Sequence, residues 1–70
     1  MITTDYHTLG LIAVTSTGSD MVARAKLVTS MAIFMNLDAG QAGHLCAKAG
    51  MNDEQTDALL EEVYGVEEAF

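Results

Sequence analysis

The stretch DMVARAKLVTSMAIFMNL, residues 20–37, decides the fold, because almost every face of a helix formed by its second half is apolar. On a wheel of 3.6 residues per turn, one apolar stripe runs from Met21 to Met35, and Ile33 and Leu37 lie nearly opposite it. A helix that is apolar all round is covered by neighbours on several sides. We therefore expect this segment to be the central helix, with part of its cover supplied by another molecule, since a short chain offers few neighbours.

The composition is that of one packed domain. The chain has 70 residues, of which 50% are hydrophobic and 19% charged, which argues against disorder. Cys46 is alone, so an intrachain disulfide is excluded. The start lacks the basic residues of a signal peptide, and no apolar run reaches the length of a transmembrane helix. We expect a single cytoplasmic domain over residues 1–70, with residues 66–70 as a tail whose Val66 and Phe70 can fold back onto the core.

Residues 1–18 fit either a helix or a strand. Tyr6, Leu9 and Ile12 recur at helical spacing, whereas the many Thr, Val and Ile residues favour a strand. A single strand would need a second copy of the chain to complete a sheet, because the monomer offers it no partner. We favour a helix that Thr4 or Asp5 caps.

Two capping boxes predict the starts of two further helices, since a polar cap and a glutamine three positions later satisfy each other's backbone groups. A glycine at a suitable distance ends each helix. The residues are Asp38 with Gln41 and Gly50, and Asn52 with Gln55 and Gly65. Small residues such as Gly43 and Cys46 predict that the first of these helices packs closely against the central one. The fold class we expect is all-α, a bundle of three to four short helices around residues 20–37.

The run LCAKAGM, residues 45–51, resembles the centre of a helix-turn-helix of the repressor type. In that family a small residue is followed four positions later by the turn glycine and then an apolar residue, here Cys46, Gly50 and Met51. The resemblance covers about residues 39–64 and implies a transcriptional regulator. However, the helix that would enter the DNA groove begins Asn-Asp-Glu-Gln-Thr-Asp, and carboxylates repel phosphates. We do not expect direct binding of nucleic acid.

The acidic residues are unevenly distributed. The three acids and three bases of residues 1–50 cancel, so the net charge of -7 comes from seven acids after position 50. A helix N-terminus favours anions, but Glu61 and Glu62 fall in the last turn, where anions are disfavoured. Two interpretations stay open, a solvated face that keeps the protein soluble and a surface for a basic partner. The candidate partner-binding residues are Asp53, Glu54, Asp57, Glu61 and Glu62.

The sequence contains no recognisable catalytic or metal-binding set. His44 and Cys46 lie two positions apart, so on a helix they point in different directions, and two ligands are too few for a metal. No arrangement of nucleophile, base and acid follows from the spacing. We expect no enzymatic activity, no cofactor and no metal, with Cys46 as a small core residue.

Three functions remain open. The first is a small acidic regulator or inhibitor that docks on a basic protein surface, including one that normally holds nucleic acid. The second is a structural or assembly subunit that forms a homodimer through an apolar interface of Met31, Phe34 and Met35. The third is the transcriptional regulator that the helix-turn-helix resemblance implies. No membrane partner is expected for so acidic a chain.

Overall fold

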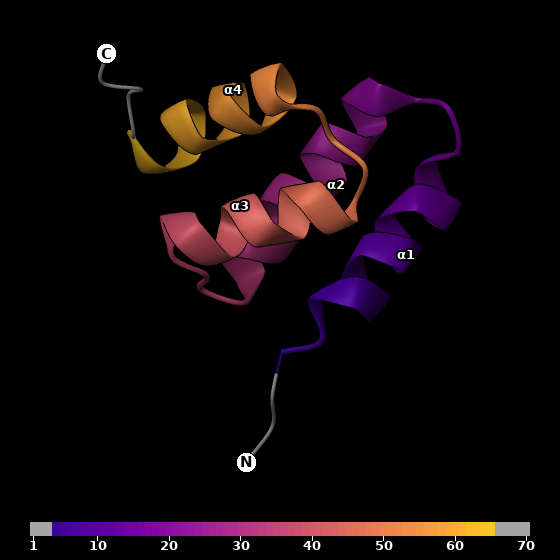
Figure 1. Cartoon of the computed structure of the whole chain (residues 1–70), viewed down its shortest axis with the longest axis horizontal. Coiled ribbons are helices and arrows are strands. Elements are labelled where there is room, and N and C mark those ends of the chain that lie inside the picture. Colours follow the sequence, from indigo (N-terminus) through magenta and orange to yellow (C-terminus); the bar gives the residue numbers. More distant parts are fainter. Residues whose placement is uncertain (1–3, 66–70) are drawn as a thin grey trace.

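The computed structural model describes residues 4–65 and folds them into four helices, with no strand among these residues (Figure 1). The helices are α1 (Tyr6–Thr17), α2 (Met21–Phe34), α3 (Ala39–Lys48) and α4 (Asp53–Tyr64). The predicted all-α class is confirmed, and the N-terminal segment is a helix rather than a strand. The predicted tail over 66–70 lies outside the described residues.

Every helix starts at a polar side chain that accepts a hydrogen bond from a backbone N–H three positions later. The four caps are Asp5, Asp20, Asp38 and Asn52. Both predicted capping boxes are present, because the backbone N–H groups of Asp38 and Asn52 donate to the side chains of Gln41 and Gln55 at 2.9 and 3.1 Å. The short polar signals in the sequence thus set where α3 and α4 begin.

The helix α2 ends at Phe34 and is shorter than the predicted segment 20–37. Asn36 adopts a left-handed conformation with φ 55°, which reverses the chain. The N–H of Leu37 then donates to the carbonyl of Ala32 at 2.9 Å, closing the helix end. Leu37 is buried in this turn, so its apolar side chain belongs to the loop before α3 and not to the helix.

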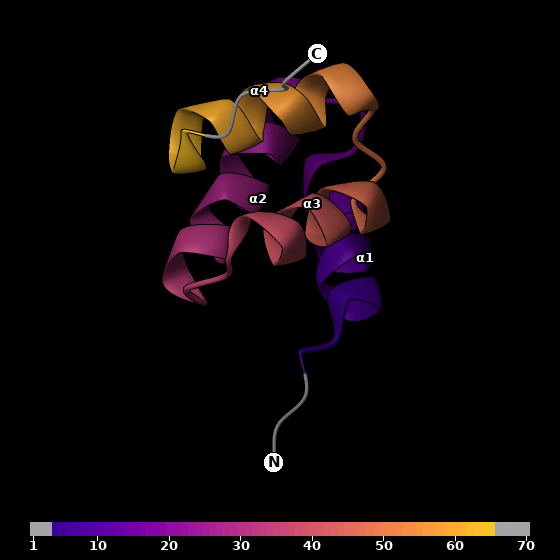
Figure 2. The same cartoon turned by 60° about the vertical axis from the view of Figure 1, so that its left-hand side comes forward.

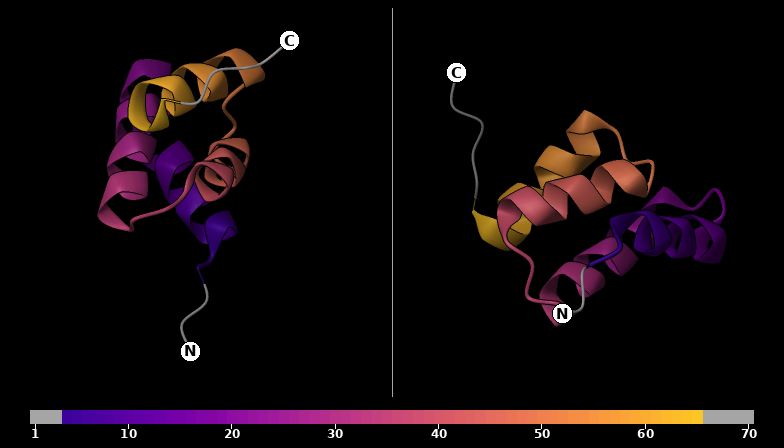
Figure 3. Two further views of the ribbon diagram at one scale, coloured as in Figure 1. Left: turned by 90° about the vertical axis from the view of Figure 1, so that its left-hand side faces the viewer. Right: turned by 60° about the horizontal axis from the view of Figure 1, so that its bottom comes forward.

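The helix α3 lies between α1 and α4 (Figures 2 and 3). Its closest approach is to α1, where a Cβ added to Gly10 would overlap the carbonyl group of Lys48. The prediction that Gly43 packs against the central helix is wrong, because an added Cβ there would meet Leu60 of α4, at 3.8 Å. Cys46 is fully buried, as predicted. The small residues of α3 therefore serve contacts with α1 and α4 more than with α2.

One cation lies inside this core. Arg24 of α2 is only 7% exposed, and its guanidinium donates to the hydroxyl of Thr17 at 3.0 Å. It also donates to the carbonyl oxygens of Gly18 and Ala49, which follow the ends of α1 and α3. Buried charge is costly unless it is well hydrogen-bonded, and here three acceptors surround it. Arg24 thus joins the ends of two helices to a third.

Candidate functional site

The acidic face of α4 carries the five residues predicted to bind a partner. Asp57 is half-buried, whereas Asp53, Glu54, Glu61 and Glu62 are exposed. The opposite side of the helix supplies Leu59 to the core. The helix therefore separates an apolar inner side from a charged outer side, as its sequence pattern predicted.

The described acids fall into two groups by what they do. The three that precede α4, namely Asp5, Asp20 and Asp38, each cap a helix. The cap of α4 is instead Asn52, so none of the five carboxylates of α4 is used to start that helix. Asp53 and Glu54 still lie in its first turn, where the helix dipole favours them. Glu61 and Glu62 lie in the last turn, which has no basic residue.

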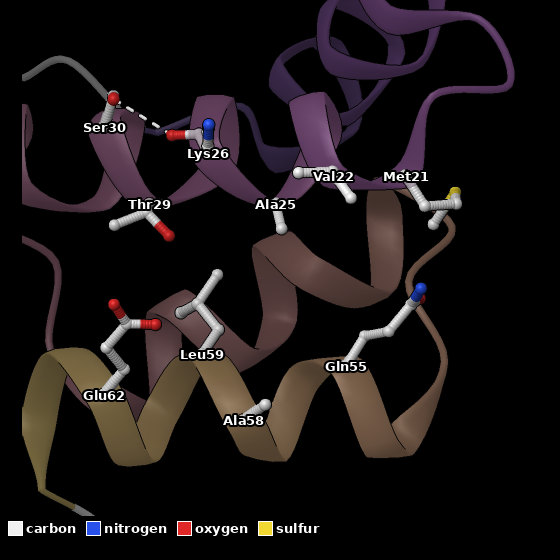
Figure 4. A pocket seen from close by; sticks show the side chains of 10 residues that line it. All are labelled: Met21, Val22, Ala25, Lys26, Thr29, Ser30, Gln55, Ala58, Leu59 and Glu62. Atoms are coloured by element: carbon white, nitrogen blue, oxygen red, sulfur yellow. Dashed lines mark hydrogen bonds between the residues drawn. The ribbon is translucent and has the colours of Figure 1, made fainter.

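A groove with a volume of about 700 Å³ runs between α2 and α4, beside the acidic face (Figure 4). The two helices run in the same direction along it, from Met21 and Gln55 at one end to Ser30 and Glu62 at the other. Apolar or small side chains line the middle of the groove. The central lining residues are Val22, Ala25 and Thr29 from α2, and Ala58 and Leu59 from α4.

The end of α2 exposes a second, mainly apolar surface. Phe34 is 91% exposed and Ile33 64%, with Met35 partly exposed in the turn that follows. Met31, the third residue of the predicted apolar interface, is half-buried and packs against the core. Ile33 was not among the predicted residues, because a helix apolar on every side does not show in its sequence which side remains uncovered.

The residues considered for metal binding or reactivity do not come together. Burial raises the pKa of the Cys46 thiol, and a hydrogen bond with Thr56 opposes this only in part. His44 is exposed, and its ring meets that of Tyr6 edge-on at a centroid distance of 4.9 Å. Within residues 4–65, no group of three or more potential ligands is placed to hold a metal ion.

The residues that resemble a helix-turn-helix surround the connection from α3 to α4. Gly50 has φ 73°, and Cys46 and Met51 are buried on either side of it. The exposed start of α4 presents Asp53 and Glu54, a surface that repels a phosphate backbone. The residues that resemble a helix-turn-helix therefore place no basic side chain at the start of α4.

No protein-family model, no curated protein and no solved structure matches the chain. None of the helices between residues 4 and 65 has the length and apolar content needed to cross a bilayer.

Proposed function

We propose that this protein is a small non-enzymatic binding module that regulates or inhibits a partner by docking the acidic face of α4 on a basic protein surface. The proposal rests on a difference between the acidic residues before α4 and those on it. Those before residue 50 cap helices, whereas the carboxylates of α4 are left free of that task and gathered on one side.

The last turn of α4 supports the same conclusion. Glu61 and Glu62 stand where the helix dipole disfavours negative charge, and Glu61 lies one turn after Asp57, a repulsive spacing. These placements cost some helix stability. A surface that needs carboxylates for a partner accounts for them better than the requirements of the fold do.

Electrostatic docking predicts a particular response to salt. Complementary charges mainly speed association, and ions screen them over a Debye length of about 8 Å at physiological ionic strength. The affinity for the partner should therefore fall between low and physiological salt, chiefly through a slower association rate.

The test begins with capture of the partner from the source cell by the intact protein. Binding is then measured for Glu61→Gln/Glu62→Gln, which removes two charges from the acidic face and is expected to weaken binding about tenfold at low salt. The matched control is Ser16→Lys/Ala47→Lys, which changes the net charge equally at exposed positions of α1 and α3. Equal losses of affinity in both variants would show that net charge alone explains the effect. An unchanged affinity of the glutamine variant at both salt concentrations would refute the proposal.

The exposed side chains of Ile33 and Phe34 favour a second candidate function, self-association as an assembly subunit. Contiguous exposed apolar surface of this kind marks interaction sites in soluble proteins. Sedimentation at micromolar concentration should then show a dimer, and Ile33→Ser/Phe34→Ser should return the protein to a monomer. A wild-type chain that sediments as a monomer at every concentration would exclude this function.

A further inference from the structure

The geometry points to the groove between α2 and α4 as the docking site for a basic amphipathic helix of the partner protein. This inference rests on the proposed function and specifies where on the surface the partner lies and what chemistry it presents. It places the contact at the side of the acidic face that borders α2.

The shape of the groove suits a helix. Small side chains, Ala25 on one wall and Ala58 on the other, leave room between the helices, and Leu59 forms an apolar floor (Figure 4). Helices pack at interaxial distances of about 8–10 Å, and small residues at the contact allow the lower end of that range. From Met21 to Ser30 the groove wall is roughly 14 Å long at 1.5 Å per residue, which accommodates between two and three turns of a partner helix.

The charges along the groove define the chemistry of its occupant. Glu62 lines the groove on the α4 side, and Glu54, which lies outside the lining, is exposed about two turns earlier on the same helix. The α2 side carries Lys26 instead. A complementary helix would place apolar side chains over Ala58 and Leu59, two basic side chains about two turns apart along one edge, and a neutral or acidic residue on the other edge.

A second copy of this chain does not meet that description. The sequence has only three basic residues, of which Arg24 is buried, Lys26 lines the groove itself and Lys48 ends α3. None of the four described helices carries two exposed cations two turns apart. The occupant is therefore a different protein.

The experiment uses a synthetic helical peptide of about 16 residues, long enough to populate a helix, with a Leu/Ala stripe and Lys residues two turns apart on one edge. A peptide of the same composition in scrambled order, which has no stripe, is the control. Amide shifts of the labelled full-length protein are followed during titration. We expect the shifts to concentrate at Val22, Ala25 and Ala58, with the striped peptide binding about tenfold more tightly than the scrambled one.

Two variants test the position of the peptide. Ala58→Trp fills the groove at an exposed site and should weaken binding about tenfold, whereas Ala47→Trp, at an exposed site on α3, should leave it unchanged. Equal binding of both peptides would refute the docking groove and indicate only general attraction to an acidic protein. A striped peptide that does not bind at roughly millimolar concentration would refute it as well. Shifts centred on Ile33 and Phe34, or groove shifts that depend on protein concentration without peptide, would also overturn it. Failure of the proposed function is a separate result. It would appear as a captured partner that binds the Glu61→Gln/Glu62→Gln variant as tightly as the parent protein.

Discussion

The guanidinium of Arg24, near the start of α2, donates a hydrogen bond of 3.3 Å to the carbonyl oxygen of Ala49, just beyond the end of α3. The same group reaches Thr17 and Gly18 at the end of α1. The C-terminal ends of helices carry partial negative charge, so one cation satisfies two such ends. This buried contact fixes the positions of three helices, including the α2 wall of the groove.

Arg24→Met should destabilise the protein by about 2–4 kcal/mol, because it leaves a hydroxyl and two carbonyls without their charged donor. Urea denaturation followed by circular dichroism measures the loss. Lys26→Met, an exposed change on the same helix, should stay within about 0.5 kcal/mol of the parent. Equal stability of the two variants would mean that burying the guanidinium costs as much as its hydrogen bonds contribute.

Gly10→Ala should destabilise by about 1–3 kcal/mol even though alanine is the better helix former, because its Cβ would overlap the backbone of Lys48. The matched control is Gly43→Ala, whose Cβ would make only an ordinary contact with Leu60 and which should stabilise by about 0.5–1 kcal/mol. Thermal unfolding of both variants checks the contrast. A Gly10→Ala variant more stable than the parent would show that α1 and α3 can move apart at this contact without loss of stability.

The cap of α1 should weaken in acid. Hydrogen bonds from the hydroxyl and the backbone N–H of Thr8, at 2.6 and 3.1 Å, hold the pKa of Asp5 below its ordinary value of 3.8. The unfolded chain therefore takes up the proton first, so the contribution of this cap is complete above about pH 4 and is lost as the pH falls through the lower folded pKa. The amide shift of Thr8 reports the titration. Asp5→Asn keeps a good cap without a titrating group, and its Thr8 shift should not follow this curve.

Glu61→Lys/Glu62→Lys should leave the protein folded and slightly more stable, by a few tenths of a kcal/mol, because cations are favoured in the last turn of a helix. The first of these substitutions also places a cation one turn after Asp57, where the parent has a repelling carboxylate. Thermal unfolding at low salt is the measurement. A clear loss of stability would show that the two glutamates serve the fold, which would remove one support for the proposed docking face.

The features that the sequence predicted correctly depend on residues close together in the chain. A capping box such as Asp38 with Gln41 is complete within four residues, and the turn at Gly50 depends on its own backbone conformation. The apolar and acidic sides of α4 follow from helical spacing alone. These features could be predicted because the neighbours that determine them are close in the sequence.

The features that the sequence did not predict depend on distant partners. The contact of Gly10 with Lys48 joins residues of two helices, and nothing near Gly10 indicates it. In the sequence Arg24 is one of three cations that balance three acids, and only the fold buries it against Ala49. The groove likewise needs the relative placement of α2 and α4, which no single segment encodes.

Among the described residues, α1 and α4 share no contact, and α1 begins on the side of the molecule away from α4 (Figures 1 and 2). A tether attached ahead of Tyr6 would therefore leave both the acidic face and the groove unobstructed. The protein can be immobilised or fused at that end with α4 still facing outward.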